Sequence, residues 1–154
     1  TVLFFNRRSF QSIKYLRSKL PIDIKKANLD PLSFHLYYSG FTYTFNPSEG
    51  VTNALMNSST FNLVSNDELR QLLISWGDVV SDYQEEEVNA LNNYTIHLKP
   101  FEKKYFYWGE DDQWLNDPRV DLTILESLEF DNYVMDRYSD LKNILENSSL
   151  YIIM

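Results

Sequence analysis

The residues of this sequence best suited to chemistry lie close together between positions 105 and 117. Aromatic and acidic side chains gather there, and the candidate ligand loop contains Trp108, Glu110, Asp111, Asp112 and Trp114. Closely spaced carboxylates supply the oxygen ligands that Ca²⁺ prefers. Aromatic rings beside carboxylates also resemble the composition of sugar-binding clefts, and a carboxylate pair could serve a glycosidase. One interpretation is therefore a ligand-binding domain that uses this loop for a sugar or Ca²⁺.

The same loop has a plainer interpretation. The EF-hand pattern of alternating acids, a central glycine and a glutamate at the twelfth position is absent from it. A run of acids in a loop is usually solvated, and aromatic residues at the end of a helical bundle usually cap its core. We favour this interpretation, and so we assign no catalytic, cofactor-binding or metal-binding residue.

The sequence offers few other reactive groups. It contains no cysteine and only two histidines, His35 and His97. Without cysteine there can be no disulfide, thiolate metal site or cysteine nucleophile, and two histidines leave little room for a multi-histidine metal site. His35 lies among apolar residues, where we expect a packed imidazole rather than a metal ligand. Nucleophile elbows, phosphate-binding glycine loops and metalloprotease helices are missing as well, so we expect a non-enzymatic protein without a cofactor.

Composition indicates one mainly helical domain. The chain has 154 residues, of which 44% are hydrophobic and 16% aromatic, enough to build a real core. Only 4 Gly and 5 Pro suit a helical chain better than a β fold with many turns. The net charge of −8 argues against a nucleic-acid partner, whose phosphates would be repelled. No apolar run of about 18 residues is present, so we expect no segment of this sequence to span a membrane.

Apolar residues recur at helical spacing in three long segments. The pattern predicts helices over 2–20, 66–99 and 127–154, and shorter helices over 31–38 and 47–57. The expected fold class is mostly α, an antiparallel helical bundle in which 66–99 and 127–154 are the two long helices. The shorter helices would cover one side. The first helix is also the only locally positive segment, which we interpret as a solvated face.

Two helix starts carry clear capping signals. Asn46 precedes Pro47, and Glu49 follows three residues after the asparagine, so these residues predict the start of the short helix. A capping box from Ser65 to Glu68 predicts the start of the long one. The end of that long helix is expected before Pro100, because proline breaks helical hydrogen bonding.

Two short features depart from the helical pattern. Residues 41–45 alternate aromatic residues with threonine, which is the only clear two-residue period in the chain. A lone strand would have no partner, so we expect an extended connection whose aromatic rings pack on helices. Glu87 interrupts the apolar face of the long helix. We interpret the acidic run 85–87 as a solvated turn, with Glu87 near the helix contact.

The order of several motifs resembles one protein family. The tripeptide Phe45-Asn46-Pro47 is followed by a short helix, by the segment 62–70 (Asn-Leu-Val-Ser-Asn-Asp-Glu-Leu-Arg) and by a long helix. The segment 128–132 (Leu-Glu-Phe-Asp-Asn) is similar to that family's entry into its final helix. The family consists of uncharacterised proteins common in marine Bacteroidota, known only as a domain of unknown function. The resemblance implies an N-terminal membrane anchor followed by a helical region, and it implies no activity, substrate or cofactor.

The two ends and the resemblance together set our functional expectation. The sequence begins with Thr1 and the apolar residues 2–5, and it ends on the apolar segment 150–154. We expect a piece of a longer bacterial protein, namely a periplasmic or otherwise extracytoplasmic region held to the membrane by a preceding anchor. Its expected role is interaction or sensing, with a protein partner or a second copy bound through its helices.

Overall fold

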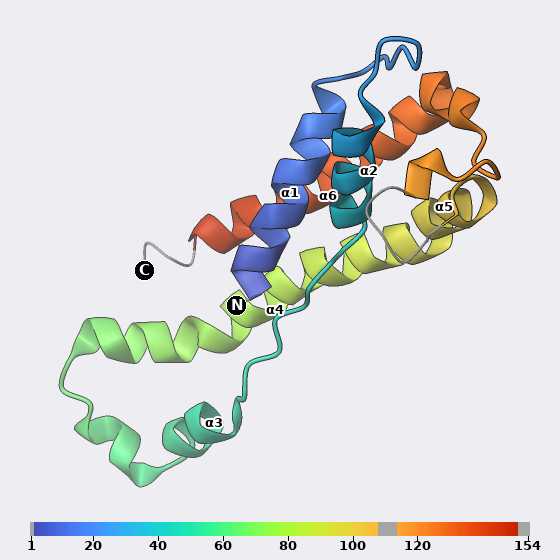
Figure 1. Cartoon of the computed structure of the whole chain (residues 1–154). Coiled ribbons are helices and arrows are strands. Elements are labelled where there is room, and N and C mark those ends of the chain that lie inside the picture. Colours follow the sequence, from blue (N-terminus) through green and yellow to red (C-terminus); the bar gives the residue numbers. More distant parts are fainter. Residues whose placement is uncertain (1, 108–113, 151–154) are drawn as a thin grey trace.

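The computed structural model describes residues 2–107 and 114–150, with side chains through residue 146. The described chain is mostly helical, as predicted, and contains no strand (Figure 1). Its α-helices are α1 (Val2–Arg17), α2 (Leu29–Ser39), α3 (Gly50–Met56), α4 (Asp67–Asn93), α5 (Lys99–Tyr105) and α6 (Leu128–Leu150). Short helical turns are η1 (Ser59–Leu63), η2 (Tyr94–Leu98), η3 (Trp114–Asn116) and η4 (Leu122–Glu126).

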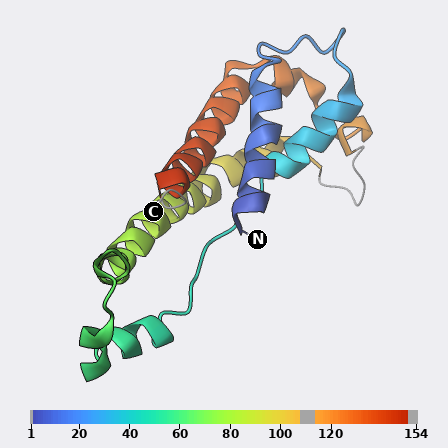
Figure 2. The same cartoon turned by 90° about the vertical axis from the view of Figure 1, so that its left-hand side faces the viewer.

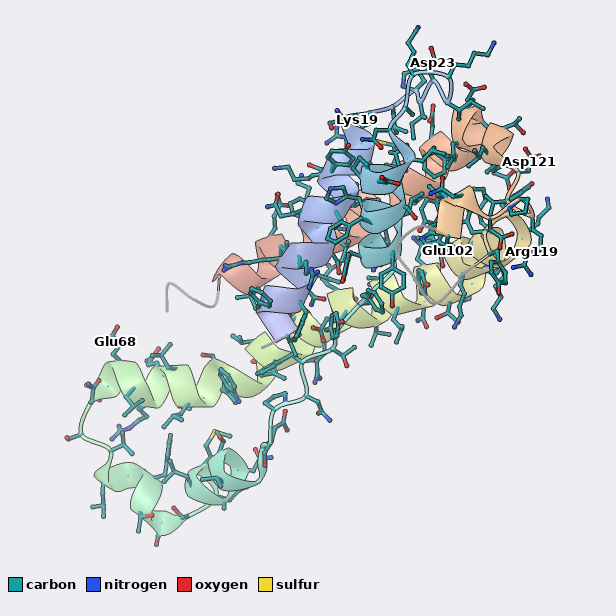
Figure 3. All side chains as sticks on the ribbon, in the orientation of Figure 1. Lys19, Asp23, Glu68, Glu102, Arg119 and Asp121 are labelled. Carbon is teal, nitrogen blue, oxygen red and sulfur yellow. The ribbon has the colours of Figure 1, made fainter. Side chains whose placement is uncertain are left out.

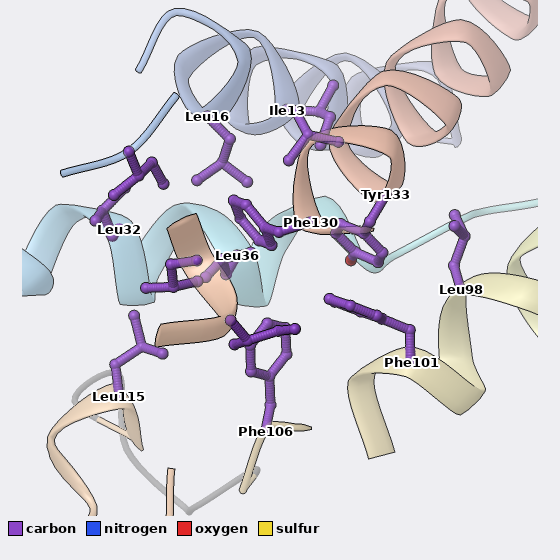
Figure 4. Packing of buried hydrophobic residues seen from close by; sticks show 14 of the residues in the cluster. Ile13, Leu16, Leu32, Leu36, Leu98, Phe101, Phe106, Leu115, Phe130 and Tyr133 are labelled. Carbon is purple, nitrogen blue, oxygen red and sulfur yellow. The ribbon is translucent and has the colours of Figure 1, made fainter. Parts of the chain in front are cut away.

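The core forms where α6 packs against α1 on one side and against the second half of α4 on the other (Figures 1 and 2). α2 packs on α1, and the turn η3 reaches α2. The close-up in Figure 4 shows Leu16 and Leu36 facing Phe130, while Tyr133 lies beside Phe101. These side chains are almost fully removed from water, and their burial is the main favourable term in folding.

Helix boundaries differ from the prediction by a few residues. α1 ends at Arg17 rather than at residue 20. α2 begins at Leu29 because the side chain of Asn28 accepts a hydrogen bond from the Asp30 amide at 3.2 Å. α4 begins at Asp67 because Asn66, and not Ser65, caps the helix. The Asn66 side chain accepts a hydrogen bond from the Leu69 amide at 3.0 Å.

The predicted capping group at Asn46, Pro47 and Glu49 does not form. The chain has no regular secondary structure at Asn46 and Pro47, and α3 begins only at Gly50, with Glu49 in the α conformation as a cap that makes no side-chain hydrogen bond. The reason lies one residue upstream, where side chains of α4 hold both backbone groups of Phe45. This tertiary contact continues the extended path and delays the helix.

The expected end at Pro100 was wrong as well. The backbone of α4 continues through the π-helical turn η2 into α5, which runs to Tyr105. Pro100 occupies the first turn of α5, where a missing N–H costs little. The predicted single helix is thus two α-helices joined by a change of hydrogen-bond register.

Residues 41–48 cross the molecule as an extended segment (Figure 1), and between 41 and 45 its peptide groups bond to side chains rather than to a neighbouring strand. Arg137 Nε donates to the Ser39 carbonyl at 2.8 Å, and its Nη2 donates to the Phe41 carbonyl at 2.8 Å and to the Thr42 hydroxyl at 2.7 Å. The side chain of Asn6 accepts from the Tyr43 amide and donates to the Tyr43 carbonyl.

Phe45, two residues after Tyr43, is also held through both of its peptide groups. The Phe45 amide donates to Glu87 Oε2 at 2.7 Å, and Gln84 Nε2 donates to the Phe45 carbonyl at 3.0 Å. Successive contacts thus come from α6, α1 and α4, so one extended segment ties three helices together. This outcome confirms the predicted extended connection. The interpretation of 85–87 as a solvated turn was wrong, because these residues lie within α4 and Glu87 is buried against the extended segment.

The aromatic rings of this segment also pack as predicted. Tyr43 stacks on Phe5 of α1 with ring centroids 4.7 Å apart, and Phe45 meets Tyr83 of α4 edge to face at 6.0 Å. Such pairs add to the stability gained from burial alone. The two-residue period seen in the sequence therefore reflects alternate rings turned towards helices.

Replacing Arg137 with methionine should destabilise the fold by about 3–5 kcal/mol, because a fully buried guanidinium is lost and two backbone carbonyls lose their donors. The free energy of unfolding from urea titrations measures this loss. Arg119→Met is the matched control, since Arg119 is exposed and its partners, Asp117 and Tyr107, also lie at the surface or close to it in sequence, and it should change stability little. Equal effects of the two substitutions would contradict the role given to Arg137.

Candidate functional site

Only part of the predicted ligand loop lies within the described residues. Trp108, Glu110, Asp111 and Asp112 lie outside the described residues. Trp114 is only 2% exposed and packs on Phe106 with ring centroids 5.1 Å apart. Its ring belongs to the core and is not available to stack on a sugar, which corrects its assignment as a ligand residue and favours the core-capping interpretation.

The histidines do not form a metal site in the described structure. His35 stacks on Tyr15 with ring centroids 4.1 Å apart, and its Nδ1 lies 3.2 Å from the Ser12 hydroxyl. Burial lowers the pKa of its imidazole. Across residues 2–107 and 114–150, no group of three His, Asp or Glu side chains is placed to bind a metal ion.

The most distinctive surface is a projecting arm, residues 50–79, formed by α3, η1 and the first half of α4. Figures 1 and 2 show it extending away from the packed helices. None of its residues is buried, whereas Val80 and Tyr83 just beyond it are part of the core. The arm is closed by Arg70, whose Nη2 donates to the Val64 carbonyl at 2.6 Å and so ties η1 to α4.

Large apolar side chains lie open on the arm. Val51 is 79% exposed, Leu63 78%, Ile74 59% and Leu69 47%. Single exposed apolar residues are normal, but several on one projecting element mark an interaction surface. The sequence showed the helical period of this segment but not that its first half lies outside the core.

Charge is divided unevenly between the helices. α1 carries Arg7, Arg8, Lys14 and Arg17 and no acidic residue. α4 carries seven acidic residues and one arginine. The basic side chains of α1 form no ion pair within the described chain, although Arg8 and Arg17 lie over the rings of Tyr38 and Tyr138.

A second candidate site is a cavity of about 310 Å³ between the end of α2 and α5. Its lining consists of Tyr37, Gly40, Phe41, Tyr94, Lys99, Glu102 and Lys103. Glu102, labelled in Figure 3, extends from α5 and is 2% exposed. The π-helical turn η2 supplies Tyr94 and leads into Lys99. Such turns are rare and occur often at functional sites.

Hydrogen bonds fix the Glu102 carboxyl group. Tyr94 donates its hydroxyl to Oε2 at 2.8 Å, and Tyr133 donates its hydroxyl to Oε1 at 2.5 Å. Burial raises the pKa of this carboxyl above its usual value of 4.5, while the two tyrosine hydroxyls and the charge of Arg137 act in the opposite direction. The group is therefore a positioned acid at the base of the cavity.

The raised pKa of Glu102 predicts a specific pH dependence. Above pH 4.5 the unfolded chain releases this proton while the folded chain retains it, so the free energy of unfolding should fall as pH rises until the raised folded pKa is passed. Glu102→Gln removes this contribution. We expect the stability of the original chain relative to this variant to decrease with pH over that window, as measured by urea unfolding from pH 4 upwards. Glu87 and Asp140 are present in both proteins, so a flat or rising difference would contradict the assignment.

Sequence reasoning missed the cavity residues. Glu102 and Lys103 follow Pro100, which was taken as the end of a helix, so their helical spacing from Lys99 was not considered. Reading on past Pro100 would have placed Lys99 and Lys103 one turn apart on the same helix face.

Comparisons with known proteins add no family, since no family model, curated protein or solved structure matches the chain. Within the described part of the chain, none of the helices combines the length and apolar character needed to cross a membrane.

Proposed function

We propose that this chain is a non-enzymatic interaction or sensing region of a membrane-anchored protein and that it self-associates through the arm. The observation that carries the proposal is the arm itself, thirty residues without a buried side chain and with four large apolar residues exposed. Burying such a surface against a partner would remove apolar area from water at little conformational cost, because the helices are already formed.

Charge favours a second copy of this chain as the partner. On α1, Phe4, Arg7, Gln11 and Lys14 are exposed and follow helical spacing, so they form one basic face with an aromatic end. On α4, the exposed Asp78, Asp82 and Glu85 follow the apolar part of the arm. The two faces are complementary in charge and in apolar content. In a symmetric dimer, the arm of each copy could therefore pack on α1 of the other copy.

The rest of the proposal rests on other grounds. The membrane anchor is proposed on the family resemblance, and the extracytoplasmic location is proposed together with it. The arrangement proposed for the domain is an antiparallel bundle with α4 and α6 as its two long helices, and the contacts between α4 and α6 support it.

Sedimentation velocity across a concentration series tests self-association. We expect a dimer that dissociates in the double variant Leu63→Asp/Ile74→Asp, because two buried apolar contacts become unpaired charges. Leu128→Asp is the matched control, since Leu128 is 74% exposed but lies outside the arm. A chain that stays monomeric at about 100 µM, a concentration that reveals even weak dimers, would overturn the proposal.

Charge reversal tests the choice of partner surface. Arg7→Glu/Lys14→Glu and Asp78→Lys/Asp82→Lys should each weaken the dimer, because like charges then oppose one another. Mixing the two variants should restore association in one of the two reciprocal contacts, and combining all four changes in one chain should restore both. Failure of any restoration, with the folds intact, would show that α1 and α4 do not meet in the dimer.

A further inference from the structure

The mouth of the cavity beside Glu102 carries positive charge. Lys99 and Lys103 lie four residues apart on α5, both exposed, and neither forms an ion pair within the described chain. Two ammonium groups on one helix face repel each other and favour an anion between them. In a chain with a net charge of −8, such a locally positive hollow is distinctive.

The walls of the cavity are aromatic. Tyr37 and Phe41 meet edge to face with ring centroids 5.2 Å apart, and Tyr94 lines the cavity beside them. Aromatic walls favour a flat ring, which can stack on or abut their faces. The volume of about 310 Å³ lies at the lower end of the range for small-molecule sites, about 300–1,000 Å³, and suits a molecule with a single ring.

The base of the cavity is polar and fixed. A β-carbon placed on Gly40 would lie 3.4 Å from the Tyr94 hydroxyl and 3.5 Å from Glu102 Oε1, so both oxygens border the space that glycine leaves open. Both Glu102 oxygens already accept hydrogen bonds from tyrosine hydroxyls. The carboxyl is therefore partly satisfied within the protein, and it does not neutralise the lysines by direct pairing.

We propose that this cavity binds a small aromatic anion, a single ring bearing one phosphate or carboxylate group. The anionic group would lie between Lys99 and Lys103, and the ring would lie against Tyr37 and Phe41. An organic cation would also suit aromatic walls, but the two ammonium groups at the mouth would repel it. The site differs in place and ligand from the acidic loop considered in the sequence, and it does not depend on self-association.

Isothermal titration of the full chain tests the ligand class. Phenyl phosphate and benzoate are the probes, and inorganic phosphate, benzyl alcohol and benzylamine are the comparators, which lack the ring, the charge or the negative sign. We expect both aromatic anions to bind with dissociation constants at least about tenfold below those of every comparator, because only they satisfy both parts of the site.

Substitutions locate the binding. Lys99→Met/Lys103→Met should raise the dissociation constant at least about tenfold, because the charged contacts are lost. Lys104→Met is the matched control, since Lys104 is an exposed neighbour on α5 that does not line the cavity. Gly40→Leu keeps both lysines but fills the cavity, so it should abolish binding. If that variant fails to fold, the exposed lysine pair still decides the question.

Three outcomes would overturn the proposal. Inorganic phosphate binding as tightly as phenyl phosphate would show that the lysines collect anions without a ring site. Tighter binding of benzylamine would reverse the charge assigned to the ligand. No heat and no thermal shift with either aromatic anion at about 10 mM would remove the site altogether. Repeating the titration on Leu63→Asp/Ile74→Asp separates this test from the test of self-association.

Discussion

The buried guanidinium of Arg137 is the interaction on which the arrangement of the other elements depends. It lies in the middle of α6 and holds the end of α2 and the start of the extended segment through the carbonyls of Ser39 and Phe41. Those carbonyls have no helix or strand to satisfy them, and an unpaired buried carbonyl is costly. The guanidinium of Arg137 therefore supplies the hydrogen bonds that a helix or a neighbouring strand would otherwise donate to these carbonyls.

A charge buried this completely needs compensation, and the surroundings provide it. Burial lowers the pKa of Arg137, and the ionisable side chains of Tyr133, Asp140, Tyr94 and Glu102 around it act in the opposite direction. Its guanidinium also lies 5.3 Å from the centre of the Tyr94 ring. Because Tyr94 and Tyr133 both donate to Glu102, the arginine and the carboxyl belong to one connected polar group inside an otherwise apolar core.

The features of the fold that could be predicted are those that a local sequence pattern determines. Helical periodicity found every long helix, because a face that must be buried repeats every three to four residues. Arg137 occupies one such position, between Val134 and Leu141, so its charge on the apolar face of α6 was a visible signal of a buried polar contact. Glu87 gave the same kind of signal in α4, where its interruption of the apolar face was noticed but its burial against the Phe45 amide was not expected.

What could not be predicted depends on contacts distant in sequence. The start of α3 moved because Glu87 and Gln84 hold Phe45 from about forty residues away. The helix continued past Pro100 because a π-helical turn absorbed the change in hydrogen bonding. Neither effect can be seen in a local window, since the decisive partner lies on another element or depends on the register of the whole helix.

The extended segment also explains why the arm and the cavity are expected to act independently. Phe41 borders the cavity, and the same segment leads on to α3 in the arm. Between them, Asn6 holds both peptide groups of Tyr43, and Glu87 and Gln84 hold those of Phe45. A ligand can shift a distant element only if it binds two arrangements with different affinity. These two sets of hydrogen bonds hold the segment between the sites, so we expect a ligand that contacts Phe41 to leave the arm unchanged.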